Sequence, residues 1–338
     1  MKKSCGKLSF WRSKARSFFK ILMVVGFILQ SAKFLEMYLK YPSFLQLDVE
    51  EPQEVEFPAF TVCNLNEIRS TPYCARYPER CGSAETTKNF CEFPEYCRLV
   101  NDTKKQVPLH PISHYNLSRY EQQLFGHQWN GLVVDCVIET DGNEEKCNET
   151  PILVPALSHS ETVAFNCFMM YSLYGQPNGH PKRVPISTVI RLHMNLEIGE
   201  YHPSHLSRGA QISVHSPYHV PSPMSEGWLL NLGNIYRFYT RLTRQILLPP
   251  PYKSNCRDYM KEWKANGGMG PMTQKMCKVK CKLDKSLYLY GCADPFIDYP
   301  HNETICDHEI PNFHASARSE CAEKCSMSCR IPVEPRLT

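Results

Sequence analysis

The segment Thr273-Gln-Lys-Met-Cys-Lys-Val-Lys-Cys-Lys-Leu-Asp-Lys285 places two cysteines four residues apart in a run without proline or glycine. Residues four apart lie on one face of a helix, so both thiols point the same way. Three cysteines repeat this spacing downstream, and two such segments running antiparallel predict a nested ladder of disulfides. The predicted pairs are Cys281–Cys321, Cys277–Cys325 and Cys256–Cys329, with Cys292–Cys306 closing the innermost loop.

A zinc site is the competing interpretation of these cysteines. Structural zinc favours CxxC or Cys/His pairs in a reducing compartment. Four N-glycosylation sequons argue for an oxidising compartment instead, and they begin at Asn101, Asn116, Asn148 and Asn302. The thirteen histidines are scattered, and pairs such as His202/His205 lack a third ligand. We therefore predict disulfides, histidines at the surface or in loops, and no metal site.

The remaining cysteines indicate a membrane topology. Of the seventeen, only Cys5 precedes the single strongly apolar segment, and the other sixteen follow residue 40. Disulfides persist outside the cell and thiols stay reduced inside. The first twenty residues contain seven basic residues and no acidic one, as cytosolic flanks do. These seven exceed the formal net charge of +4, which leaves −3 for the remainder and implies no nucleic-acid partner.

The apolar segment predicts a membrane helix over residues 18–40, after a cytosolic N-terminus at 1–17 and before an extracellular region at 41–338. Phe18 to Tyr38 would be about 31 Å long as a helix, enough for a bilayer core of roughly 30 Å. Lys33 and Glu36 interrupt it, and their spacing allows them to pair on one face. A cleaved signal peptide is the alternative, although Gln30-Ser31-Ala32 has Gln where a small-x-small cleavage site needs a small residue.

The region after the helix has enough apolar and aromatic content for a packed core. An amphipathic, helical piece is expected around Leu117–Trp129, between cysteine-dense turns. Three strand-like runs follow at Val184–Ile198, Gln211–His215 and Ile235–Leu248.

Several motifs together resemble the degenerin/epithelial sodium channel family. Phe57-Pro-Ala-Phe-Thr-Val-Cys-Asn-Leu-Asn66 is similar to the segment that follows the family's first membrane helix. Ile212-Ser-Val-His-Ser-Pro217 resembles a palm-strand signature, and Leu248-Pro-Pro-Pro-Tyr-Lys-Ser-Asn-Cys256 resembles the entry to the thumb. The ladder resembles the thumb disulfides. The motifs occur in the family's order over nearly the whole chain, and pickpocket-type invertebrate members look most similar.

The resemblance implies a membrane protein of the α+β class. One N-terminal transmembrane helix would precede a disulfide-rich ectodomain with a finger region at about 68–165, palm strands at about 184–248 and a helical thumb at about 252–330. It also implies the pairs Cys136–Cys147 and Cys63–Cys167. The four additional cysteines, which would enlarge the finger region and pair among themselves, are Cys74, Cys81, Cys91 and Cys97.

The function implied is that of a subunit of a trimeric, sodium-selective, amiloride-sensitive channel in the plasma membrane. Such a subunit conducts sodium ions, is not an enzyme and carries no cofactor. Tyr38 and Tyr252 match positions where aromatic residues couple the membrane helix to the thumb. The family's second helix and its Gly-x-Ser filter do not occur before Thr338, so we expect a fragment. The alternative is a secreted or single-pass anchored, cysteine-rich extracellular binding or modulatory protein.

Overall fold

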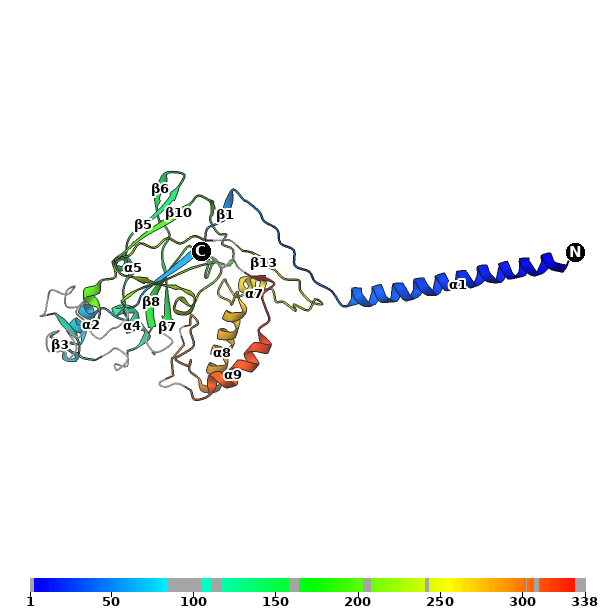
Figure 1. Cartoon of the computed structure of the whole chain (residues 1–338). Coiled ribbons are helices and arrows are strands. Elements are labelled where there is room, and N and C mark those ends of the chain that lie inside the picture. Colours follow the sequence, from blue (N-terminus) through cyan, green and yellow to red (C-terminus); the bar gives the residue numbers. More distant parts are fainter. Residues whose placement is uncertain are drawn as a thin grey trace. The chain divides into compact units, whose positions relative to one another are not determined.

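The computed structural model of the chain describes residues 3–83, 105–110, 117–157, 164–202, 208–240, 243–301, 303–306 and 310–331 (Figure 1). The chain forms two compact units. The first comprises Met1–Glu50 and Leu248–Asn255, and the second comprises Glu51–Leu247 and Cys256–Thr338.

The first unit contains helix α1 (Lys3–Leu39), which Figure 1 shows as one uninterrupted helix. Gly26 is its only interior glycine after residue 6, and no proline occurs before Pro42. Because proline disfavours helical backbone in the residue before it, Pro42 accounts for the end of the helix. Tyr41, which directly precedes this proline, has a left-handed backbone with φ 45°.

The second unit is built around an antiparallel sheet of five strands in the order β12-β11-β2-β8-β7. Their bounds are β2 (Ala59–Asn64), β7 (Ile152–Leu157), β8 (Ala164–Met170), β11 (Gly209–His215) and β12 (Trp228–Asn231). All six residues of the middle strand β2 are buried, as expected for a strand covered on both faces. This strand begins twenty residues after the end of α1, with only β1 between them in the sequence.

The two faces of this central sheet bury different apolar clusters. On one face Phe60 and Phe168 pack with residues of a second sheet, whose strand order is β10-β5-β6. On the other face Met169 packs with Trp263 and Met276, which belong to helices. The second sheet consists of β5 (Val133–Thr140), β6 (Asn143–Lys146) and β10 (Val189–Met194).

The β5–β6 hairpin turns at Asp141-Gly142, where both residues have positive φ, 49° and 82°. These angles match the two-residue turn that suits the twist of paired strands, and Asp-Gly is a preferred sequence for it. Three short pairs complete the strands. They are β1 (Glu54–Glu56) with β9 (Arg183–Pro185), β3 (Cys81–Ser83) with β4 (Gln106–Pro108), and β13 (Gln245–Ile246) with β14 (Arg330–Ile331).

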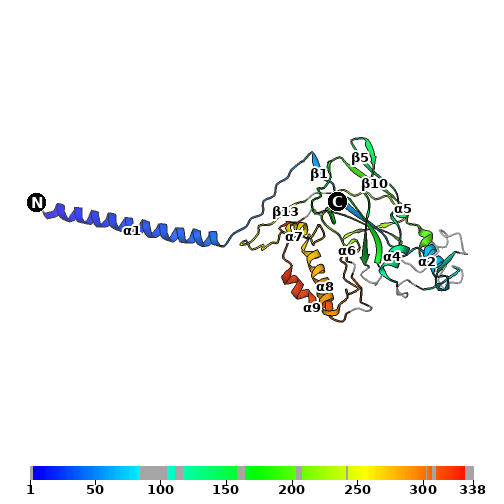
Figure 2. The same cartoon turned by 180° about the vertical axis from the view of Figure 1, so that it is seen from behind.

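Short helices connect the strands, and two longer helices form a pair near the C-terminus. The short ones are α2 (Ser70–Arg76), η1 (Pro78–Arg80), α4 (Arg119–Phe125), α5 (Trp129–Leu132), η4 (Ile198–Glu200), α6 (Pro223–Glu226) and α7 (Tyr259–Ala265). Helices α8 (Gln274–Tyr290) and α9 (Phe313–Lys324) lie side by side in both views (Figures 1 and 2). The Thr273 side chain caps the start of α8, and Gly291 ends it with a left-handed φ of 72°.

These elements confirm the predicted α+β class with one N-terminal apolar helix and a disulfide-rich region behind it. The helical piece expected around Leu117–Trp129 is present as α4 and the start of α5. The run Ile235–Leu248 was wrongly predicted as a strand, because within its described residues only Gln245–Ile246 finds a partner strand. Alternation of apolar residues alone does not form a strand without a neighbour to bond to. The central sheet instead takes β7 and β8 from residues upstream of the predicted palm range.

Two neighbouring glycines after α7 allow a direct test of this backbone. Both have positive φ, but a Cβ at Gly267 would meet no atom within 4 Å, whereas one at Gly268 would lie 2.7 Å from the Gln176 nitrogen. The Gly268 oxygen also accepts a hydrogen bond from the Gly175 nitrogen. We expect Gly267→Ala to cost about 1 kcal/mol from left-handed strain, and Gly268→Ala about 1–3 kcal/mol more from the clash.

The measurement is urea unfolding of the chain with intact disulfides, followed by the fluorescence of the tryptophans, of which Trp263 is buried beside these glycines. Equal losses in the two variants would contradict the close backbone contact at Gly268.

Candidate functional site

The described part of the chain contains one helix that is long and apolar enough to cross a membrane, Lys14–Leu39. The side chains of this span are exposed throughout, so none of its apolar surface is covered within the chain. The pairing expected between Lys33 and Glu36 is not the one that forms. The Glu36 carboxylate instead accepts a hydrogen bond from Lys40 at 2.7 Å, one turn further on. This bond places both charges at the helix end, where water can solvate them.

Three tyrosines connect the end of this helix to the segment Leu248–Asn255 within the first unit. The Tyr41 ring packs edge-on against Tyr252 with centroids 5.5 Å apart, and Tyr38 contacts Tyr41 at 6.4 Å. The predicted residues Tyr38 and Tyr252 are therefore brought close through Tyr41, which the sequence did not single out. Such ring contacts contribute roughly 0.5–1.5 kcal/mol beyond area burial. The segment that holds Tyr252 leads directly to Cys256, the first cysteine of the ladder.

Four disulfides brace the region around α8 and α9. Cys277 and Cys281 project from one face of α8 and bond to Cys325 and Cys321. The remaining two pairs are Cys256–Cys329 and Cys292–Cys306. This is the nested arrangement that the spacing predicts. The three ladder bonds close loops of 40 to 73 residues, so each is expected to stabilise by roughly 2–4 kcal/mol.

Three further disulfides lie outside this ladder, and the pairs are Cys63–Cys167, Cys136–Cys147 and Cys74–Cys81. Cys63 and Cys167 are directly opposite each other on β2 and β8, with Cα atoms 4.2 Å apart. This separation is that of a non-hydrogen-bonded antiparallel pair, where side chains come closest. The bond therefore joins the middle strand of the central sheet to its neighbour. Cys91 and Cys97 lie outside the described residues.

One predicted glycosylation site can be located. Asn148 is exposed in the turn after β6, next to the disulfide-bonded Cys147. The other three sequon asparagines, Asn101, Asn116 and Asn302, lie outside the described residues. Among the described residues, no group of three or more His, Cys, Asp or Glu side chains is placed to hold a metal ion.

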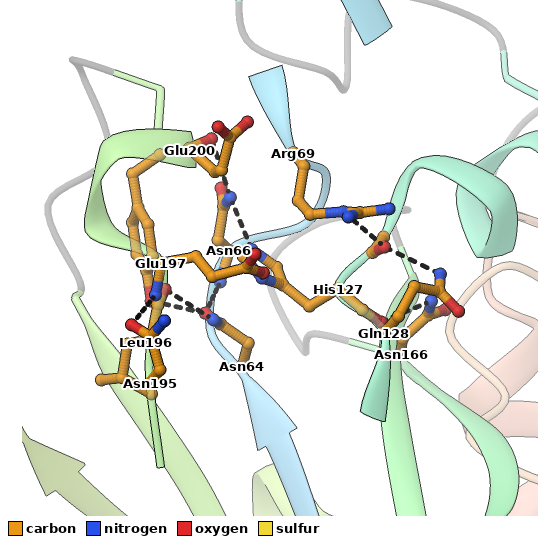
Figure 3. Close-up of polar contacts among 12 residues, drawn as sticks. Asn64, Asn66, Arg69, His127, Gln128, Asn166, Asn195, Leu196, Glu197 and Glu200 are labelled. Carbon is orange, nitrogen blue, oxygen red and sulfur yellow. Dashed lines mark hydrogen bonds and ion pairs between the residues drawn. The ribbon is translucent and has the colours of Figure 1, made fainter. Parts of the chain in front are cut away.

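A buried polar cluster, which the sequence analysis missed, surrounds His127 at the end of the central sheet (Figure 3). The His127 side chain is fully buried between Asn66, which follows β2, and Glu197, which precedes η4. Its Nδ1 lies 2.7 Å from the Glu197 carboxylate, and its Nε2 lies 2.9 Å from the Asn66 amide nitrogen. We call Asn66, His127 and Glu197 the polar joint.

Hydrogen-bond partners determine how the histidine ring is protonated in this joint. The Asn66 amide nitrogen also donates to the carbonyl oxygens of Ile68 and Glu200, at 2.6 and 3.0 Å. An amide nitrogen can only donate, and its two hydrogens are shared among these two carbonyls and the ring, so Nε2 accepts. Nδ1 then carries the hydrogen and donates to Glu197. This hydrogen bond lowers the pKa of Glu197 below its usual value.

Neighbouring groups hold the joint in place. Asn166 of β8 donates to the His127 carbonyl at 3.0 Å, and its amide occupies the space that a Cβ at Gly126 would need, 2.5 Å away. Burial works to raise the pKa of Glu200, yet the Lys105 ammonium at 2.7 Å and the Thr71 donors outweigh it and lower that pKa. The joint therefore connects β2, β8 and the α4–α5 turn with η4.

A second buried histidine, His215, is the last residue of β11. The rings of His215 and His219 are 6.1 Å apart. His215 is bonded to the Thr61 hydroxyl and to the Ser216 carbonyl, both at 2.9 Å. Burial lowers its pKa to about 3, so this ring is neutral throughout the physiological range. His202 is buried too and contacts the Pro108 carbonyl at 3.0 Å. The expectation that histidines lie at the surface or in loops was therefore wrong for His215, which is buried in β11, whereas the buried His127 and His202 lie in loops.

Comparison with known proteins identifies the family to which this chain belongs. The family model described as "Amiloride-sensitive sodium channel" matches residues 4–331, from the first turns of α1 to the end of β14. The chain belongs to this family. The degenerin-like protein asic-1 of Caenorhabditis elegans is a curated relative, 24% identical over 216 residues. That match covers 59% of this chain and 24% of the relative, so the chain spans about a quarter of the relative's length.

Membership of the amiloride-sensitive sodium channel family confirms the resemblance seen in the sequence. The matched region contains the apolar helix, the central sheet and all seven described disulfides. The signal for the polar joint was also present in the sequence, as Asn64-Leu-Asn66 and Gly126-His127, but nothing in either segment indicated that they meet.

A first prediction concerns one rung of the ladder. A single change, Cys281→Ala or Cys321→Ala, leaves a thiol that can exchange with other disulfides during folding. The double variant removes the same bond without leaving that thiol, so we expect more of it than of either single variant at the cell surface. Surface biotinylation with non-reducing gels measures this, and Cys5→Ala serves as a control outside the ladder. Equal or lower yield of the double variant would contradict the pairing.

A second prediction concerns the polar joint. Asn66→Asp keeps the shape of the side chain but turns a carboxylate oxygen toward the carbonyls of Ile68 and Glu200. We expect a loss of about 2 kcal/mol or more in unfolding free energy, because a buried charge then faces acceptors. Asn143→Asp, the same change at an exposed position of β6, should stay within roughly 0.5 kcal/mol of the parent. Urea unfolding at pH 7 measures both, and similar small losses would show that the joint is not required.

Proposed function

We propose that the chain belongs to a subunit of a sodium-selective, amiloride-sensitive cation channel of the plasma membrane. The observation that carries the proposal is the family match over residues 4–331, which takes in both the candidate span and the disulfide-braced region. The subunit would assemble as a homo- or hetero-trimer with other family subunits, and sodium ions would be the permeant species of the complete channel.

The proposed topology follows from the chemistry on either side of α1. The N-terminal residues up to 17 would be cytosolic, with Cys5 reduced, and the region from residue 41 onward would be extracellular. Seven disulfides and the exposed sequon at Asn148 support the extracellular assignment, because disulfides form and N-glycans are attached in the same secretory compartments. The exposed apolar surface of α1 supports contact with lipid or with other membrane helices.

Within the ectodomain, the region from about 252 to 330 would act as the thumb, and the central sheet as the palm. The finger region would lie in the remaining residues from about 68 to 165. The Tyr38–Tyr41–Tyr252 contacts would transmit force between the membrane helix and the thumb. They suit this role because Tyr252 stands four residues before Cys256, whose disulfide with Cys329 ties the base of the thumb together.

The test is co-expression of this chain with a complete family subunit in oocytes, with sodium current measured before and after amiloride. We expect the chain to change the amiloride-sensitive current and to co-purify with the complete subunit. Tyr252→Ala should reduce the change in current, whereas Tyr252→Phe should keep it, because the ring contact and not the hydroxyl is what the structure provides.

A parallel assay of topology distinguishes the channel subunit from the alternative, a secreted cysteine-rich binding or modulatory protein. A membrane-anchored subunit retains α1, shifts in mass on glycosidase treatment, and reacts at Cys5 only with thiol reagents that cross the membrane. Secretion of a soluble form without α1 would reject the channel proposal in favour of a cysteine-rich binding or modulatory protein. Retention of α1 without any effect on current would reject the conducting role alone.

A further inference from the structure

Four side chains join the loop after β11 to the first turn of α8. They are His219, Glu226, Lys275 and Met276, which we call the clasp. The Glu226 carboxylate lies 3.1 Å from His219 Nε2 and 2.6 Å from the Lys275 ammonium. On the other side of the ring, His219 Nδ1 lies 2.9 Å from the Met276 sulfur. The histidine therefore contacts α6 through one nitrogen and α8 through the other.

The loop that holds His219 is itself bonded to the segment that directly follows β8 of the central sheet. The Pro217 carbonyl accepts hydrogen bonds from the Leu173 nitrogen at 2.8 Å and the Ser172 hydroxyl at 3.2 Å. Further along, the Ser222 hydroxyl bonds to Asp298, in the segment between α8 and α9. The loop of the clasp is therefore bonded on one side to the segment after β8, and on the other side to α8 and to the segment between α8 and α9.

The partners of the ring decide which protonation state fits the clasp. A neutral imidazole has one N–H and one lone pair, and an imidazolium has two N–H groups. Here both nitrogens face acceptors, a carboxylate and a thioether sulfur, and neither acceptor carries a hydrogen. A neutral ring must direct its lone pair at one of them, whereas the protonated ring donates to both. This is the reverse of His127, one of whose nitrogens faces a donor.

The other charged and titratable groups around the ring allow this protonation. Burial works to raise the pKa of Glu226, but hydrogen bonds from His219 and Lys275 bring it to about 2, so the carboxylate stays ionised. Lys275 of α8 is paired with that carboxylate and also donates to Ser225 at 3.0 Å. From β11 the nearest group is His215, whose neutral ring already has both nitrogens satisfied. Asp298 is held by Ser222.

We propose that the clasp is a proton-tightened contact, in which protonation of His219 strengthens the attachment of α8 to the loop after β11. At acidic pH both ring nitrogens donate, and the contact closes. At alkaline pH one of the two contacts loses its hydrogen, and the first turn of α8 opens more readily from the loop. The inference concerns the ectodomain alone and does not rest on the proposed channel function.

The test is amide hydrogen exchange on the full chain in detergent micelles at pH 8 and pH 5.5, with rates corrected for the intrinsic effect of pH. We expect protection of α6 and the first turn of α8 to rise by about tenfold at the lower pH, as one charge-assisted hydrogen bond is gained. The global melting temperature is not a suitable readout, because His215 changes it in the opposite direction. His215 takes up a proton on unfolding below pH 6.5, so it lowers the stability of the fold as pH falls, whereas the clasp would raise it.

Variants separate the clasp from other titrating groups. His219→Gln keeps a polar side chain that does not titrate, and it should show the same protection at both pH values. Glu226→Gln removes the charged acceptor and should weaken the pH dependence likewise. His193→Gln, the same change at an exposed position of β10, should behave like the parent.

Three results would overturn the proposal. They are unchanged protection in the parent chain between the two pH values, lower protection at pH 5.5, or a pH dependence that persists in His219→Gln. If that variant does not fold with its disulfides intact, the parent chain and Glu226→Gln decide the question by the same criteria.

Discussion

The disulfide ladder between α8 and α9 is the constraint on which the region from Cys256 to Cys329 depends. Helix α8 carries five lysines, which leaves a narrow apolar stripe for packing against its neighbour. Cys277 and Cys281 lie on that stripe and replace part of the missing burial with covalent bonds to α9. Because both bonds leave one helix face at a spacing of four residues, they fix the two helices in register as well as in proximity.

The central sheet connects this braced pair to the rest of the chain. Its middle strand β2 bonds covalently to β8 through Cys63, and Asn66 of the polar joint follows two residues after its last residue. Each of these contacts is buried, where an unsatisfied donor or acceptor would be costly. The strand is therefore held by a covalent bond along its length and by the polar joint just beyond its C-terminal end.

Three histidines show how the same side chain is used differently by its surroundings. His215 has one donor and one acceptor as partners and is neutral. His127 likewise faces one donor, the Asn66 amide, and one acceptor, Glu197. His219 faces two acceptors, at the contact between the sheet and α8. The difference lies in which atoms the fold brings to each ring, and the proposed clasp depends on the last arrangement.

Local patterns in the sequence determined the long apolar N-terminal helix through its composition. They also determined the helical face of Cys277 and Cys281 and the ladder pairs, because a spacing of four residues maps onto one face of a helix. Family motifs added the pairs Cys63–Cys167 and Cys136–Cys147. Only the tertiary structure decided that Tyr41 stands between Tyr38 and Tyr252, that Ile235–Leu248 has almost no strand partner, and that His127 and His219 meet Asn66 and Met276. These contacts join residues about sixty positions apart in the two histidine cases, and hydrogen-bond partners at such separations leave no periodic signal in the sequence.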